Sequence, residues 1–189
     1  MESSMKKIGI TGSLSSGKTT ASKILSYRKG PLFSADNEVK KIYKKNNLKK
    51  IISKKLNLKN YKNLKTVLRN KIINGDLNIK KVESIIHPII RKEMNDFLKK
   101  NKKKRTLFFE IPLLIESKLM KKFDLIIFIK ARKSIRLKRF KLNGGSQKLF
   151  NILDKKQLND TKKIKYCDHI VVNENNLKIL KKNLSNIII

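Results

Sequence analysis

The sequence contains no tryptophan, one cysteine, three prolines and only 14 acidic residues. The single cysteine, Cys167, has no partner in the chain for a disulfide and offers no thiolate cluster for zinc, which excludes disulfide and zinc-finger scaffolds. No apolar run approaches the roughly 20 residues of a membrane-spanning helix. Residues 1–5 lack the charged and then apolar segments of a signal peptide. We therefore expect a cytoplasmic protein without a membrane partner.

The 189 residues fit one domain, or one domain with a small appendage. Hydrophobic residues make up 39% of the chain and aromatic residues 6%, so the core must be lean. Apolar blocks such as 107–109 and 126–129 are nevertheless dense enough to form a folded centre. We therefore expect a folded rather than a disordered chain.

The shortage of acidic residues leaves a net charge of +34, from 48 Lys and Arg against 14 Asp and Glu. Such a charge first suggests a nucleic-acid-binding protein. Only seven of the 48 basic residues are Arg, the lysines are spread along the chain, and no aromatic residues interleave with them to stack on bases. We favour a solvated surface of biased composition and expect no specific nucleic-acid partner. Substrates that carry phosphate would still be attracted.

Short segments typical of strands alternate with stretches typical of helices. The predicted strands cover residues 7–11, 32–33, 106–111, 124–130 and 169–172. The third and fourth are apolar on both faces, as are central strands of a parallel sheet that helices cover. This alternation predicts an α/β fold of three layers with a parallel sheet of about five strands.

Residues 37–103 interrupt the alternation. They contain no convincing strand, and apolar residues such as Leu64 and Leu68 recur at helical spacing. We predict a helical insertion over 37–103 and a nucleotide-binding core made of residues 1–36 and 104–189.

The strongest motif follows the first predicted strand. Residues 12–19 match G-x-x-x-x-G-K-[ST] in full, and a helical run over 20–27 comes next. The loop N–H groups and the positive end of the helix cradle phosphates in such motifs, while Lys18 reaches the β- and γ-phosphates and the Thr19 hydroxyl ligates Mg²⁺. A chance turn with a surface lysine is the disfavoured alternative. The predicted ATP-binding residues of this P-loop are Gly12, Ser13, Leu14, Ser15, Ser16, Gly17, Lys18, Thr19 and Thr20.

A P-loop predicts nucleotide binding but names no reaction. Further blocks stand in order along the chain: Ile8-Gly9-Ile10-Thr11, Ser34-Ala35-Asp36, His87-Pro88 with Arg91, Pro112-Leu113-Leu114-Ile115-Glu116, and Asp168 to Asn173. Together with the P-loop, the chain from Lys6 to Asn173 resembles the dephospho-CoA kinase family, a P-loop kinase fold with a lid. The resemblance implies transfer of the ATP γ-phosphoryl to the ribose 3′-hydroxyl of dephospho-CoA, with Mg²⁺ as cofactor. We expect a monomer or a weak homo-oligomer.

Asp36 follows the second predicted strand at its carboxyl end, on the sheet edge where the P-loop also lies. A carboxylate there accepts the proton of the acceptor hydroxyl and aligns its oxygen for in-line attack. From the residues alone, an N-cap of the next helix is equally reasonable, and the resemblance favours the catalytic base. Ser34 stands where the family has the first Asp of an Asp-Ala-Asp motif, so one carboxylate is missing here.

The resemblance also places three residues beside the acceptor substrate. They are His87, Arg91 and Glu116. The residues alone favour a core histidine at position 87, and they indicate a local turn or helix start at Pro88. Arg91 stands four residues after His87 and shares its helix face.

Two residues at strand ends have open roles. Glu110 closes the third strand, where many P-loop enzymes hold an acidic residue that orients the water shell of Mg²⁺. Asn173 ends the last strand, near the adenine site of related kinases, with a helix or turn cap as the alternative. We count Asn173 among the candidate ATP-binding residues and Glu110 as a metal-site candidate that acts through water.

Residues 143–146 read Asn-Gly-Gly-Ser and predict a turn between two helices, which we take as the hinge of a lid over about residues 139–157. Arg139, before the turn, resembles the family's lid arginine and is a candidate catalytic residue. The family carries a second arginine about one helical turn later, and that position is Asn143 here.

Two other functions are compatible with the motifs. A P-loop kinase of another nucleotide-like acceptor would share the same core. An NTPase that binds a polyanion would use the +34 charge.

Overall fold

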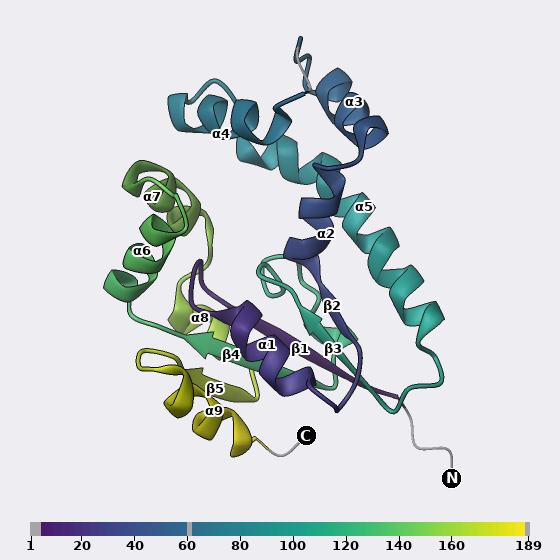
Figure 1. Ribbon diagram of the computed structural model, residues 1–189, viewed down its shortest axis with the longest axis vertical. Coiled ribbons are helices and arrows are strands. Elements are labelled where there is room, and N and C mark those ends of the chain that lie inside the picture. The colour runs from purple at the N-terminus through teal and green to yellow at the C-terminus, as the bar shows by residue number, and fades with distance from the viewer. Residues whose placement is uncertain (1–4, 60–61, 188–189) are drawn as a thin grey trace. The chain divides into compact units, whose positions relative to one another are not determined.

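The computed structural model describes residues 5–59 and 62–187, so the prediction for the start of the chain falls on residues of which only Met5 is described. The strands of Figure 1 are β1 (Lys6–Gly12), β2 (Leu32–Ser34), β3 (Thr106–Glu110), β4 (Leu125–Lys130) and β5 (His169–Val172). The helices are α1 (Lys18–Ser26), α2 (Ala35–Ile42), α3 (Asn46–Lys55), α4 (Leu64–Asn74), α5 (Ile79–Lys100), α6 (Lys133–Leu142), α7 (Gln147–Lys156), α8 (Asp160–Ile164) and α9 (Leu177–Ser185), with a 3₁₀ turn η1 (Met120–Lys122).

The five strands form one parallel sheet in the order β2-β3-β1-β4-β5. Each strand begins and ends within one residue of its predicted bounds. The predicted α/β fold with a parallel sheet of about five strands is therefore confirmed. Because β1 lies at the centre, the loop that follows it emerges in the middle of the carboxyl edge.

Alternate residues of β1 face the two sides of the sheet. Ile8 and Ile10 are fully buried in a cluster to which α1 and α9 contribute apolar residues. Gly9 points the other way, where a Cβ would lie 2.8 Å from Leu114 Cδ1 and 3.1 Å from Phe123 Cγ. The segment after β3 therefore packs so closely on this face that a side chain at position 9 would displace Leu114.

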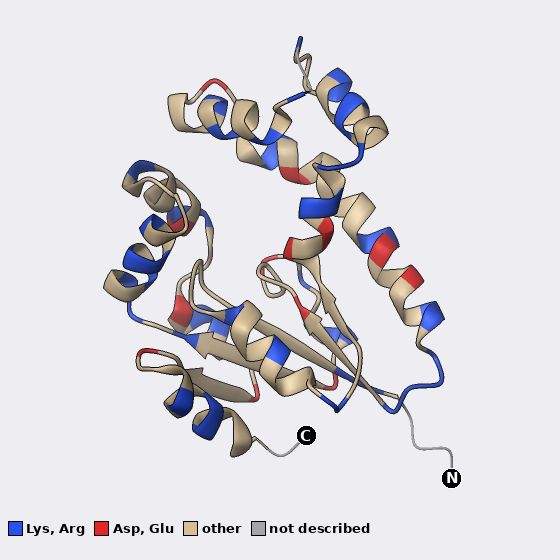
Figure 2. Cartoon of the chain, in the orientation of Figure 1, with Lys and Arg blue, Asp and Glu red and all other residues tan. Residues whose placement is uncertain are grey.

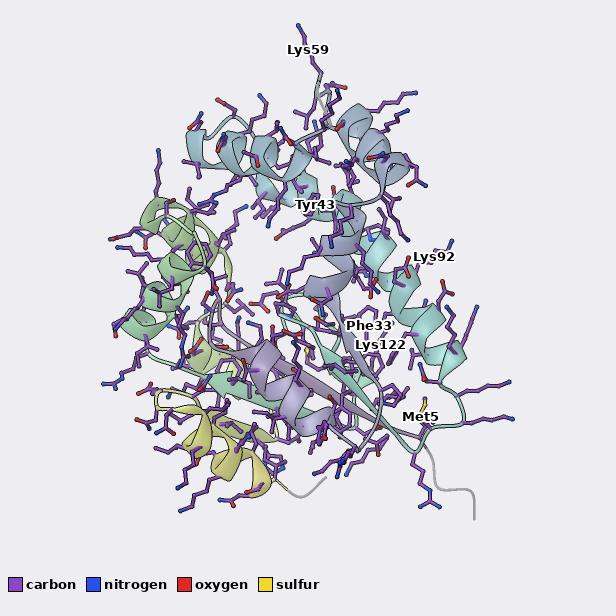
Figure 3. The ribbon with its side chains drawn as sticks, in the orientation of Figure 1. Met5, Phe33, Tyr43, Lys59, Lys92 and Lys122 are labelled. Carbon is purple, nitrogen blue, oxygen red and sulfur yellow. The ribbon has the colours of Figure 1, made fainter. Side chains whose placement is uncertain are left out.

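The chain divides into two compact units. The first comprises Met1–Ser34 with Asn101–Ile189 and contains the sheet, and the second comprises Ala35–Lys100. The described part of the second unit contains helices α2 to α5 and no strand. Its apolar core draws on all four helices, and burial against it raises the pKa of Tyr43, labelled in Figure 3.

Pro88 lies inside α5 and does not begin a helix or a turn, so the local prediction there was wrong. Proline lacks an N–H and removes one hydrogen bond from the helix interior. The apolar stripe of Val82, Ile86 and Met94 is buried on both sides of Pro88. Continuous packing of this stripe offsets the lost bond, and the helix runs on for 22 residues.

Lysine and arginine occur on every helix (Figure 2), and side chains such as Lys59 and Lys92 extend away from the ribbon (Figure 3). Among the described residues, three cations are buried: Lys18, Arg136 and Lys163. All three lie in the first unit. In the described part of the chain, no helix has the length and apolar character that a membrane span requires.

Candidate active site

The P-loop connects β1 to α1 at the carboxyl edge of the sheet. Gly17 has a left-handed φ of 94° and precedes α1 directly. A Cβ on Gly17 would collide with the side-chain nitrogen of Asn173, and one on Gly12 would collide with the carbonyl oxygen of Ile129. Both glycines of the motif are therefore required by close approach. The loop N–H groups and the start of α1 together form a site suited to an anion.

Lys18 is the first residue of α1 and only 6% exposed. Its Nζ donates a hydrogen bond of 2.8 Å to the carbonyl oxygen of Ser13, at the other end of the loop. The ammonium thus lies across the loop, within the ring of backbone that the motif forms. This is the position from which a point charge faces phosphate oxygens.

Glu110, at the end of β3, is fully buried and joins three neighbouring elements. Its Oε1 accepts a hydrogen bond of 2.5 Å from Thr19 Oγ1, and its Oε2 accepts one of 2.6 Å from Ser34 Oγ. A carboxylate at position 34 would place a second negative charge against Glu110, which makes a neutral donor the compatible choice there. The departure at Ser34 therefore fits its surroundings.

The Thr19 and Glu110 pair has the chemistry of a magnesium site. Because Thr19 donates its proton to Glu110, the lone pairs of the hydroxyl oxygen remain available to a cation. Mg²⁺ prefers oxygen ligands and retains several waters when phosphates complete its shell. The residues present therefore fit the ion.

Arg139 and Asn173 meet at the P-loop from α6 and from the end of β5. Arg139 Nη1 donates hydrogen bonds to the carbonyl oxygens of Ser16, at 3.3 Å, and of Asn173, at 3.0 Å. The buried Asn173 side chain donates to the same Ser16 oxygen at 2.8 Å. Ser16, Arg139 and Asn173, all predicted from the sequence, thus lie together. The Asn173 side chain contacts the loop backbone and does not cap the following helix α9, whose N-cap is Asn176.

The turn at 143–146 joins α6 to α7 as expected. Gly144 has a φ of 77°, and Ser146 caps α7 by accepting a hydrogen bond from the Leu149 N–H. Asn143 donates its side-chain amide to the Arg139 carbonyl oxygen at 2.9 Å. Asn143 therefore ends α6 as a C-cap, a role that an arginine side chain would not fill in the same way.

Five residues near the P-loop were not predicted. Gln157 Oε1 accepts the Leu14 N–H at 3.0 Å, and Arg136 donates to the Leu14 carbonyl at 3.4 Å and to Asp154 at 2.5 Å. The Asp160 carboxylate accepts from the Ser13 hydroxyl. Lys163, also buried, pairs with Glu116 at 2.7 Å. In the sequence, such residues look like the many other polar residues of helical segments.

Asp36, His87 and Arg91 belong to the second unit. Asp36 is exposed and is the second residue of α2, directly after β2, so it lies in the first helical turn and is not the N-cap. His87 is half-buried on α5, and Arg91 lies exposed one turn later on the same face. His87 is therefore not a fully buried core histidine.

Cys167 is a packed residue with a strongly raised pKa. Burial first, and then the charge of Asp168, raise the pKa of its thiol to about 12, against a lowering effect of Lys163.

Because the thiolate is the nucleophile, we expect iodoacetamide at pH 7.5 to alkylate Cys167 far more slowly in the native protein than in urea. Mass spectrometry over time checks this, and equal rates in the two states would contradict the burial.

Solved structures share this fold. A protein of Thermus thermophilus superposes with a TM-score of 0.76 at 21% identity, covering 96% of this chain and 95% of its own. A dephospho-CoA kinase of Campylobacter jejuni gives 0.57 at 23% identity, with coverage of 96% and 94%. A shikimate kinase of Acinetobacter baumannii gives 0.55 at 12% identity, with coverage of 97% and 90%. At these identities the likeness shows the fold alone, which is that of P-loop kinases.

Sequence relatives are more specific. A dephospho-CoA kinase of Rickettsia typhi is 32% identical over 185 residues, which are 97% of this chain and 96% of that protein. One of Bartonella quintana is 31% identical over 172 residues, 88% of each chain. A family model described as dephospho-CoA kinase matches residues 6–178. This match spans nearly the whole chain, and the chain belongs to the dephospho-CoA kinase family.

Proposed function

We propose that this chain carries out the reaction of its family, the ATP-dependent phosphorylation of dephospho-CoA to coenzyme A, with the P-loop as ATP site and Asp36 as base. The match of the family model over residues 6–178 is the observation that supports this reaction. The intact loop, with Lys18 lying across it and Thr19 held by Glu110, supports the assignment of the ATP site. We further infer a cytoplasmic enzyme that is a monomer or a weak homo-oligomer.

The protein contributes positioning and charge to phosphoryl transfer. Lys18, the loop N–H groups and Arg139 stabilise the charge on the transferring phosphoryl, and Asn173 supports the ATP site through the Ser16 carbonyl. Asp36 accepts the proton of the acceptor 3′-hydroxyl and directs its oxygen in line with the leaving group.

The acceptor side involves the helical unit. We propose that residues 37–103 bind dephospho-CoA through His87 and Arg91, and that Glu116 of the core helps to organise the acceptor pocket. A half-buried imidazole and an exposed guanidinium on one face of α5 suit the phosphates of such an acceptor.

Mg²⁺ would be held by the Thr19 hydroxyl, with Glu110 behind it. The ion would supply positive charge against the negative charge that develops on the transferring phosphoryl group. Glu110 accepts the hydrogen bond of the Thr19 hydroxyl and so leaves the lone pairs of that oxygen available to a cation.

The reaction is tested by incubating the protein with Mg-ATP and one acceptor at a time, then measuring product masses. Dephospho-CoA should gain one phosphate at its 3′-hydroxyl, while adenosine, dAMP and shikimate stay unchanged. If dephospho-CoA is untouched and another nucleotide-like acceptor is consumed, the proposed substrate is wrong.

A polyanion-binding NTPase remains the alternative from another class, because of the +34 charge. Duplex DNA or RNA at physiological salt should leave ATP turnover unchanged, since binding by scattered lysines is screened. Stimulation of turnover by either polymer would favour the alternative.

Replacing Arg139 by alanine should lower the rate of phosphoryl transfer on the order of 10³-fold, as for other arginines that clamp a transferring phosphoryl group. Arg139→Lys should not restore the rate, because lysine lacks the planar fork. Lys141→Ala should be nearly silent, because Lys141 is exposed and its ammonium donates a hydrogen bond to the Gln147 side chain. Single-turnover rates with saturating substrates check all three. A crippled Lys141→Ala or Lys148→Ala enzyme would assign the lid charge elsewhere.

A further inference from the structure

Of the three buried cations in the described part of the chain, two hydrogen-bond to the P-loop, and the third has no place in the mechanism. Lys18 belongs to the motif, and Arg136 bonds to the loop at Leu14. Lys163, on the short helix α8, is fully buried at 0% exposure and does not touch the loop itself. A buried ammonium carries a large desolvation cost, so its retention calls for partners of matching charge and geometry.

The partners of Lys163 are Glu116 and Gln157. Its Nζ lies 2.7 Å from Glu116 Oε1 and 3.4 Å from Gln157 Oε1. Glu116 is anchored in turn, because the same Oε1 accepts the Leu158 N–H at 3.1 Å. Glu116 thus fixes both the ammonium and the backbone that follows Gln157, and the side-chain amide of Gln157 is held in one orientation.

Gln157 also contacts the P-loop. Its Oε1 also accepts the Leu14 N–H at 3.0 Å. The Ser13–Leu14 peptide therefore gives its N–H to Gln157, while its carbonyl oxygen accepts Lys18 Nζ at 2.8 Å. Because an amide is planar, fixing its N–H direction also fixes where its oxygen points, and so where the Lys18 ammonium rests.

We propose that Lys163 and Gln157 are positioning residues of the ATP site, which act through the Ser13–Leu14 peptide to set the place of the Lys18 ammonium. The inference rests on the proposed role of Lys18 in binding ATP. The path consists of consecutive hydrogen bonds from Lys163 to Gln157, to the peptide, and to Lys18. Within the Ser13–Leu14 peptide, donation by the N–H and acceptance by the carbonyl oxygen polarise the amide in the same sense, which strengthens both of its hydrogen bonds.

The test uses Gln157→Leu, Lys163→Met, the double variant, and Lys162→Met as control. Leucine and methionine keep the approximate size and remove the polar contacts. Lys162 is exposed on the same helix, so its replacement controls for the loss of one positive charge. The readout is the Kd for Mg-ATP from equilibrium titration, which does not depend on the acceptor, followed by the KM values for ATP and dephospho-CoA.

Each single variant should weaken Mg-ATP binding about tenfold, the loss expected for one hydrogen bond with a charged partner. In Gln157→Leu the KM for dephospho-CoA should stay within about twofold of the wild-type value, and Lys162→Met should change neither ATP nor dephospho-CoA binding by more than that. Because both residues act along one path, the double variant should be no weaker than the weaker single variant.

Three outcomes would overturn the inference. Unchanged ATP binding in Gln157→Leu removes the path, whether or not Lys163→Met folds. Additive losses in the double variant show two independent effects. Equal changes in both KM values of Gln157→Leu, with a lower melting temperature, make the contact with Leu14 a packing feature only. A wild-type protein that binds Mg-ATP but leaves dephospho-CoA untouched contradicts the proposed function and leaves this inference standing.

Discussion

Replacing Lys18 by alanine should reduce phosphoryl transfer to the background rate while the fold persists. The ammonium lies across the P-loop, where it faces the phosphates when ATP is bound. Its loss removes a full positive charge from the point at which negative charge develops in the transition state. Preorganised charge at that point is the largest contribution to rate acceleration in such reactions. Steady-state assays of coenzyme A formation measure the loss, and Mg-ATP titration shows how much of it arises in binding.

The fold should tolerate this substitution because the side chain makes a polar contact with the loop rather than an apolar contact with the core. Lys23 provides the matched control, since it lies exposed on the same helix α1. Lys23→Ala should keep the wild-type rate, and both variants should melt near the wild-type temperature. A folded Lys18→Ala enzyme with full activity would contradict the P-loop assignment.

The sheet could be predicted from the sequence because its signals are local. Apolar runs such as 106–111 and 124–130 are typical of strands buried on both faces, and each follows a stretch with consecutive lysines. The P-loop is equally local, since its glycines, Lys18 and Thr19 lie within eight consecutive residues. Strand order, in contrast, depends on which crossovers pack, and the sequence alone leaves that undetermined.

The surroundings of the P-loop could not be predicted, because they join residues that are far apart in the chain. Leu14 and Gln157 are 143 positions apart, and Ser16 and Asn173 are 157 apart. Lys163 is one of 41 lysines, and only the folded structure distinguishes it as buried. Pro88 shows the converse, since a strong local signal was overridden by the apolar stripe that runs along α5.

The role of Asp36 can be separated from its place in the helix. Asp36 lies in the first turn of α2, where the interaction of a carboxylate with the helix dipole stabilises the helix by about 0.3–1 kcal/mol. A purely structural role therefore predicts a small loss of stability and a normal rate. A general base predicts the opposite, because proton acceptance by a positioned carboxylate contributes about 10²–10⁴-fold to the rate.

Asp36→Asn keeps the size of the side chain and removes its charge and its basicity. We expect kcat to fall by roughly 10²–10⁴-fold and the Kd for Mg-ATP to stay near the wild-type value, because the carboxylate addresses the acceptor. Glu38→Gln is the control, since it removes another carboxylate from the same helical turn, and it should leave kcat unchanged. Single-turnover rates and thermal melts of both variants decide the matter. If Asp36→Asn turns over normally and melts at a lower temperature, Asp36 stabilises the start of α2 and the base must be sought elsewhere.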